Sequence, residues 1–245
     1  MELKSNKTIV RECYRKIIRD LDLSLVDSYV KDDYIQHSPT VKNGKAGLLE
    51  MLHFLKTLPK PAEETPSPVI RLIGEGDLVA VHLNVGFMGR RMAVIDLFRL
   101  EDGLLAEHWD AGQLHTNEQD GLITMTNGTT EINEAADAAL SKKVVQGFYH
   151  ELFENRDIKT AELLLGADFI EHNPINSLLS KIDYTVKVHR LIVEGDFVVS
   201  QCENIWGDNR VASYGIFRIA DGKIAEHWRV EQAVPAVTAS GNDMF

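Results

Sequence analysis

The sequence predicts an α+β fold in two tandem copies, because it holds an internal repeat in which helical patterns precede strand patterns. YIQHSP from Tyr34 matches FIEHNP from Phe169, an offset of 135 residues. DLFRLEDGLLAEHWDAGQ from Asp96 matches GIFRIADGKIAEHWRVEQ from Gly215, an offset of 119 residues. The second copy is therefore 16 residues shorter between these two blocks.

Length and composition agree with two compact domains. The 245 residues exceed the roughly 100 to 150 residues of one typical domain. The chain is 44% hydrophobic and 26% charged, as soluble globular proteins are. We expect a first domain over residues 1–117, a linker over 118–137 and a second domain over 138–245. The segment from Pro235 onward has little periodicity, and we expect it to be loosely ordered.

Helices are expected at the start of each copy. Ile9, Cys13 and Ile17 recur at helical spacing, and the matching positions of the second copy are apolar as well. A second, short helix is expected over residues 24–30 and 159–165. In the first copy, GKAGLLEMLHFLKT predicts a third helix, which the prolines of LPKP end. The second copy has largely lost this helix.

Strand patterns follow the helices. Three runs rich in Val, Ile, Leu and Phe are separated by GEGD, FMGRR and EDG, which predicts an antiparallel meander. A three-residue loop at EDG would place Asp96 opposite His108 and Val94 opposite Asp110. Since side chains alternate between the faces of a strand, Asp96, His108 and Asp110 would then share one face.

The opposite face of this hairpin carries Arg99, Glu107 and Trp109. We expect Arg99 and Glu107 to form a structural ion pair between the two strands. Trp109 and its counterpart Trp228 are expected in a core or in an interface, because large aromatic side chains bury much apolar surface.

This order of elements, with YIQHSP and the closing DLFR, DG and EHWD motifs, resembles the SnoaL-like branch of the nuclear-transport-factor-2-like superfamily. The resemblance covers nearly the whole of both copies. It implies two cone-shaped domains, each a curved antiparallel sheet wrapped by helices around a pocket. It also implies that the two domains pair with each other, with a homodimer as a further option.

Relatives in this family include polyketide cyclases that work without metal or organic cofactor. They use a carboxylate near the end of the EHWD strand as acid and base, and Asp110 is the match that the resemblance implies. Some relatives place the key acid three residues later, where this chain has Gln113. Both positions therefore stay open, although the amide of Gln113 cannot move a proton.

Four polar residues are candidates for acid-base catalysis: Asp110, Asp96, His37 and His108. A carboxylate buried beside a second carboxylate has a raised pKa, which suits a base that works near neutral pH. A histidine can donate to the enolate formed on proton abstraction. These residues are too dispersed for the usual spacing of metal ligands, so we expect no metal and no cofactor.

Five further residues are expected to line the substrate pocket: Tyr34, Gln36, Phe54, Phe87 and Gln113. The expected ligand is a small, mostly apolar carbonyl compound.

The histidines also have a purely structural interpretation. Their counterparts His172 and His227 persist in the second copy, although Gly215 and Arg229 replace the two acids there. The second domain is therefore interpreted as a degenerate copy without the pocket acids. Two functions stay open for the first domain: a cofactor-independent acid-base enzyme, or a non-catalytic module that binds a small molecule or a protein.

Charge and cysteine content bound the partners and the location. With 26 basic and 37 acidic residues the net charge is −11, which disfavours nucleic acid and anionic membrane surfaces. No stretch approaches the ~20 apolar residues that would span a bilayer, and the start lacks a signal-peptide core. We expect a cytoplasmic protein in which Cys13 and Cys202 are buried free thiols.

Overall fold

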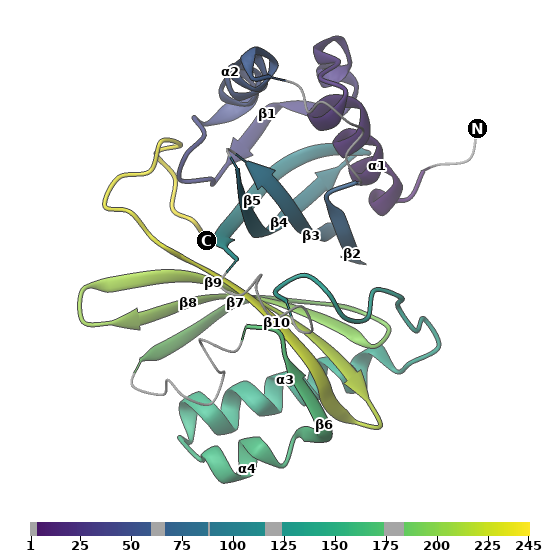
Figure 1. The fold of residues 1–245 in the computed structure, drawn as a ribbon, viewed down its shortest axis with the longest axis vertical. Coiled ribbons are helices and arrows are strands. Elements are labelled where there is room, and N and C mark those ends of the chain that lie inside the picture. Colours follow the sequence, from purple (N-terminus) through teal and green to yellow (C-terminus); the bar gives the residue numbers. More distant parts are fainter. Residues whose placement is uncertain (1–3, 60–66, 88, 116–123, 174–183) are drawn as a thin grey trace.

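The computed structural model describes residues 4–59, 67–87, 89–115, 124–173 and 184–245, and these form two five-stranded sheets. Figure 1 shows the sheets stacked on each other, with the helices of each repeat on its outer side. The predicted α+β fold in two copies is confirmed. No helix within these described ranges is long and apolar enough to cross a membrane.

The first repeat has one layer of helices over a five-stranded sheet. Its first helix, capped by Ser5, continues into a π-helical segment, and the expected second helix is a 3₁₀ helix. The elements are α1 (Asn6–Cys13), η1 (Tyr14–Arg19), η2 (Leu23–Ser28), β1 (Val30–Gln36), α2 (Gly44–Thr57), β2 (Val69–Glu75), β3 (Leu78–Phe87), β4 (Arg90–Glu101) and β5 (Leu104–Leu114).

The second repeat follows the same order without a counterpart of α2 among its described residues; the shortened stretch includes residues 174–183, which lie outside the described ranges. Its first helix is capped by Asp137 and again runs into a π-helical segment. The elements are α3 (Ala138–Tyr149), η3 (His150–Glu154), α4 (Ile158–Glu162), β6 (Leu165–Glu171), β7 (Thr185–Glu194), β8 (Phe197–Trp206), β9 (Asn209–Ala220) and β10 (Lys223–Ala233).

Each sheet is mixed, whereas the sequence led us to expect a wholly antiparallel one. The meander β2–β5 is antiparallel, as predicted. β1 adds a fifth strand that runs parallel to β5, so the order is β1-β5-β4-β3-β2. The YIQHSP block is the end of this strand, and its pairing with β5 brings the two best-matched motifs of the repeat side by side.

The register of the closing hairpin differs from the expected one by two residues. Asp102 and Gly103 both have positive φ, 53° and 78°, which gives a two-residue turn in place of the expected three-residue loop. A bulge at Leu105–Ala106 then adds one residue to β5. Asp96 therefore pairs with Asp110 rather than with His108. Because the shift is an even number, Asp96, His108 and Asp110 still share one face.

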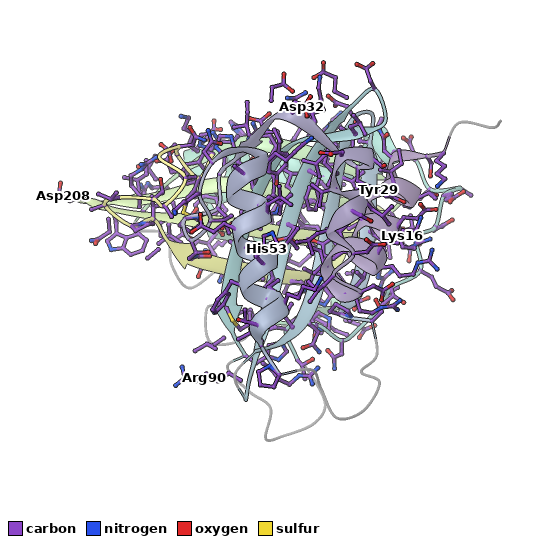
Figure 2. The ribbon with its side chains drawn as sticks, turned by 90° about the horizontal axis from the view of Figure 1, so that it is seen from above. Lys16, Tyr29, Asp32, His53, Arg90 and Asp208 are labelled. Atoms are coloured by element: carbon purple, nitrogen blue, oxygen red, sulfur yellow. The ribbon has the colours of Figure 1, made fainter. Side chains whose placement is uncertain are left out.

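The helices of the first repeat cover the face of the sheet that is turned away from the second repeat (Figure 1). Figure 2, seen from above, shows α2, marked by His53, and the first helix, marked by Lys16, both lying across this sheet. Ile17 of η1 and Leu52 of α2 are fully buried in the cluster between helices and sheet. This layer encloses the cavity described below.

The other faces of the two sheets share one buried cluster, in which Trp109 and Trp228 are both almost fully buried. The guanidinium of Arg190 lies 4.1 Å from the centre of the Trp109 ring, and that of Arg71 lies 4.0 Å from the Trp228 ring. Trp109 and Trp228 are repeat counterparts at the offset of 119, and so are Arg71 and Arg190. The contacts between the repeats are therefore reciprocal.

Hydrogen bonds between the repeats follow the same rule. The side-chain oxygen of Gln113 accepts the N–H of Glu231 at 3.0 Å, and that of Gln232 accepts the N–H of Gly112 at 2.8 Å. These two bonds are also related by the offset of 119. Reciprocal contacts of this kind are typical of a twofold dimer interface, here formed within one chain.

The C-terminal segment packs closely against the first repeat, so the expectation of a loosely ordered tail is wrong. The N–H of Ala239 donates to the carbonyl oxygen of Pro39 at 2.9 Å. The Met244 side chain is fully buried in the cluster between the sheets. At the offset of 119 its counterpart is Met125 in the connection between the repeats, which is buried in the same cluster. Burial of these two apolar side chains holds both segments in place.

Candidate functional site

A cavity of about 320 Å³ lies in the first repeat, between the sheet, η1 and α2. Most of its wall is aliphatic, and its polar groups gather on β1, β4 and β5. No lysine or arginine lines it among the residues that the structure describes. Such a cavity suits a neutral, mostly apolar molecule with one polar group. Its apolar wall includes Ile17, Leu48, Met51, Leu55, Val85 and Val94.

Asp96 and Asp110 face each other across β4 and β5, and both line the cavity. The hydroxyl of Ser38 donates to Oδ2 of Asp110 at 3.1 Å, while Oδ1 of Asp110 is buried and has no hydrogen-bond partner among the described residues. Burial raises the pKa of Asp110 from 3.8 to about 6. The charge of Asp96 adds to this rise, and His108 and Ser38 oppose it.

Tyr14 belongs to this site, although the sequence pattern marked it only as a core position of the first helix. Its hydroxyl donates to Oδ2 of Asp96. Burial, with the nearby charge of Asp96, raises the pKa of Tyr14 well above its ordinary value, so the hydroxyl stays protonated. The signal in the sequence was a hydroxyl group at a predicted buried position, which requires a polar partner.

His108 is oriented by β1. The backbone N–H of Ser38 donates to Oε1 of Gln36 at 2.9 Å, and Nδ1 of His108 lies 2.8 Å from the same oxygen. An oxygen can only accept, so Nδ1 of His108 carries a proton. Nε2 then faces Oδ1 of Asp96 at 3.5 Å. Burial alone would lower the pKa of His108, but Asp96 and Asp110 outweigh it and raise this pKa.

His37 does not line the cavity, which corrects its assignment to the catalytic set. Tyr34 and Gln36 of β1 face the cavity, and since side chains alternate, His37 points to the other face. There its Nε2 lies 2.9 Å from Glu107, and its ring stacks on Trp109 with centres 4.9 Å apart. The predicted ion pair of Arg99 and Glu107 lies on this face too and is confirmed, at 2.9 Å.

Two expected pocket residues, Gln113 and Phe54, also lie elsewhere, and a third, Phe87, is not described beyond its backbone. Gln113 contacts the second repeat through Glu231, because it shares the face of Trp109 on β5. Phe54 points outward from α2 and is 56% exposed. The backbone of Phe87 ends β3, but its side chain lies outside the described part of the structure.

The second repeat holds a different set of groups at the equivalent place. Arg229 pairs with Gly215 across β10 and β9, where the first repeat has its two carboxylates. A Cβ at Gly215 would lie 2.8 Å from the hydroxyl oxygen of Ser200, which bonds to Tyr149 at 2.8 Å. Side chains therefore fill the space where Asp96 stands in the first repeat. No acid pair exists at this position of the second repeat.

Two observations bear on other ligands. No group of three or more His, Cys, Asp or Glu side chains is placed to hold a metal ion within the described ranges. Cys13 and Cys202 are free and buried, as expected, and burial raises the pKa of both thiols, to about 12 and about 11.

Comparisons with known proteins give one family match. The family model described as a SnoaL-like domain matches residues 10–108, which is most of the first repeat and less than half of the chain. A search of curated proteins finds no match.

Several solved structures align with part of the chain. IdmH from Streptomyces antibioticus, a proposed polyketide cyclase, is 18% identical with a TM-score of 0.37, covering 45% of this chain and 93% of its own. A proposed ketosteroid isomerase from Kribbella flavida is 16% identical with a TM-score of 0.36, covering 40% and 81%. TsrD from Streptomyces laurentii is 23% identical with a TM-score of 0.36, covering 46% and 92%.

Proposed function

We propose that the cavity of the first repeat, whose residues 10–108 match the SnoaL-like domain model, is the active site of a cofactor-independent acid-base enzyme. The substrate class is a small, mostly apolar carbonyl compound without net charge. One observation carries the proposal: in a mostly apolar cavity, the buried carboxylate of Asp110 has one oxygen without a hydrogen-bond partner among the described residues, and it lies opposite a second carboxylate. A base of this kind has a pKa close to the pH at which it works.

In the proposed reaction, Oδ1 of Asp110 takes the proton next to the carbonyl group, and the C–H electron pair forms the enolate. Protonated His108 donates from Nε2 towards the carbonyl oxygen. Asp96, which accepts from the Tyr14 hydroxyl, lies beside Nε2 of His108 and orients this donor. Return of the proton to another carbon gives isomerisation. Attack of the enolate on a second carbonyl of the same molecule, whose oxygen then takes the proton from Asp110, gives aldol cyclisation. Departure of a β-hydroxyl, which takes the same proton and leaves as water, gives dehydration.

Exchange of the α-proton with solvent tests the shared first step. The full chain is incubated in D₂O with neutral cyclic and aromatic ketones, and loss of the α-proton signal is followed by NMR. We expect exchange in the wild type, and a drop of about 10²- to 10⁴-fold in Asp110→Asn, because general base catalysis is lost.

The matched control is Asp32→Asn, which removes an exposed carboxylate of β1 that pairs with Lys45 at 2.6 Å. Exchange as fast in Asp110→Asn as in the wild type would contradict the assignment of the base. Ketone binding without any exchange would instead favour the non-catalytic binding module.

We further propose that the second repeat replaces the mate of a homodimer. The shared buried cluster and the reciprocal contacts of Trp109 and Trp228 support this role. We also propose that the protein is cytoplasmic, because its two cysteines are free thiols, as is usual in a reducing compartment.

A further inference from the structure

The C-terminal segment of the second repeat reaches the strand end that carries two cavity residues. Nδ2 of Asn242 donates to the backbone oxygen of Gln36 at 2.9 Å. Nδ1 of His37 donates to the backbone oxygen of Asp243 at 2.5 Å. Two adjacent tail residues thus bond to two adjacent residues at the end of β1.

This end of β1 sets the hydrogen bonds of the acid-base groups. Gln36 accepts from Nδ1 of His108, and two residues later Ser38 donates its hydroxyl to Asp110. Both side chains are almost fully buried, Gln36 at 2% and Ser38 at 1% exposure. A displacement of the backbone at Gln36 therefore changes both bonds.

The tail itself is held by the second repeat. Arg210 pairs with the carboxylate of Asp243 at 2.8 Å, and Gln201 donates to the backbone oxygen of Met244 at 3.3 Å. The side chain of Met244 is buried between the sheets. The position of Asn242 is thus fixed from the far side of the interface.

We propose that Asn242 is a positioning residue for the cavity of the first repeat, and that the second repeat takes part in this site through its tail. Asn242 acts through Gln36, which holds His108 in one tautomer, and through Ser38, which donates a hydrogen bond to Asp110. The inference rests on the proposed function for what Asp110 and His108 do, but the contacts stand independently of any reaction.

The test uses the full chain and needs no substrate. Asn242→Ala removes the donor, and Asn242→Asp keeps the shape of the side chain while replacing the N–H donor with an oxygen. The readouts are the carboxyl ¹³C titration of Asp110 and the ¹⁵N shifts of the His108 ring. Because the Ser38 hydroxyl lowers the pKa of Asp110, we expect both variants to raise this pKa by roughly half to one unit, and we expect the same of Ser38→Ala. At a pH above the pKa of His108, where its ring is neutral, the ¹⁵N shifts should change from the Nδ1-protonated pattern to a mixture of tautomers.

Val237→Ser is the matched control, because Val237 lies in the same tail and is 85% exposed; it should leave both readouts unchanged. Wild-type titration and ¹⁵N shifts in a folded Asn242→Ala or Asn242→Asp would overturn the proposal. Loss of the fold in both variants would also count against it, since Asn242 would then serve overall stability.

The two proposals fail in different ways. If the wild type exchanges no ketone protons but the Asn242 variants change both NMR readouts, the proposed function is wrong and the positioning role stands. If the wild type exchanges protons but the Asn242 variants leave both NMR readouts unchanged, only the positioning role is wrong.

Discussion

Asp96 and Asp110 lie directly opposite each other, but they have different partners. Asp96 accepts from Tyr14 and faces His108, whereas Asp110 accepts from Ser38 and keeps Oδ1 without a partner among the described residues. A buried oxygen without a donor gains most from taking up a proton. This difference supports the proposal that Asp110 transfers the proton and that Asp96 orients its neighbours.

The rate of proton exchange should depend on pH in a way that these groups determine. Asp110 must be ionised to act as base, so kcat/KM should rise with pH through its pKa of about 6. At higher pH it should fall again above the raised pKa of His108, because neutral His108 has no proton on Nε2 to donate. A pH series of the exchange assay measures both limbs. A rate that does not fall below a pH of about 6, or that does not fall above the pKa of His108, would contradict this pair of roles.

Tyr14 and its repeat counterpart Tyr149 allow a paired test of one hydroxyl. The Tyr14 hydroxyl satisfies a buried carboxylate, whereas that of Tyr149 bonds to the neutral Ser200. Tyr14→Phe should lower the free energy of unfolding by about 1.5 to 3 kcal/mol, and Tyr149→Phe by about 1 kcal/mol, since hydrogen bonds to charged groups are stronger. Urea unfolding of the full chain measures both. Equal losses would show that Asp96 does not depend on Tyr14.

Among the elements, the closing hairpin shows why the face of the site could be predicted although the register could not. The turn and the bulge each shifted the pairing by one residue, and together they returned Asp96 and Asp110 to the same face. A count along the sequence finds the face by parity but has no information on a bulge. His37 was misassigned for a related reason: the alternation along β1 places Gln36, and not His37, towards the cavity.

The predictions for Phe54, Tyr14 and the C-terminal segment were wrong or incomplete because the periodicity of the sequence does not encode the features that decide them. An amphipathic pattern does not tell which buried position of α2 or η1 reaches a cavity, so Phe54 was included and Tyr14 was not. The segment from Pro235 onward was expected to be loosely ordered because it has little periodicity. Only the structure shows that Met244 and Met125 fill equivalent places.

The position of α2 over the cavity depends on Gly47. A Cβ there would lie 2.0 Å from the backbone oxygen of Lys42, a contact that only a shift of the chain can relieve. We expect Gly47→Ala to lower the free energy of unfolding by about 2 kcal/mol or more. Gly86→Ala is the control, because a Cβ at Gly86 would meet nothing within 4 Å. Thermal unfolding compares the two variants, and an unchanged midpoint for Gly47→Ala would contradict the close approach.

At the scale of the whole molecule, the face of the second sheet that carries Trp228 also holds a buried charge, Glu226. Glu226 accepts from Arg218, Thr129 and His172, as its counterpart Glu107 accepts from Arg99 and His37. Burial opposes ionisation, but these hydrogen bonds lower the pKa of Glu226 from 4.5 to about 2. Ionised Glu226 is therefore more favourable in the folded chain than in the unfolded one.

Stability towards acid should reflect this group. A lowered pKa contributes stability above about 4.5, and this contribution is lost as the pH falls from there to about 2. We expect a loss on the order of 3 kcal/mol across this range, and a smaller one in Glu226→Gln. Urea unfolding as a function of pH measures it. Glu50→Gln, at an exposed pair with Lys42, is the control, and identical pH dependence of all three proteins would refute the assignment.

The covalent connection between the repeats changes how their pairing depends on concentration. Two separate subunits that share a buried cluster come apart on dilution, and a site that needs the partner is then lost. Here the two faces are tethered, which corresponds to an effective concentration in the mM range for a short linker. The tail that bonds to Gln36 therefore stays available to its own cavity at any dilution of the protein.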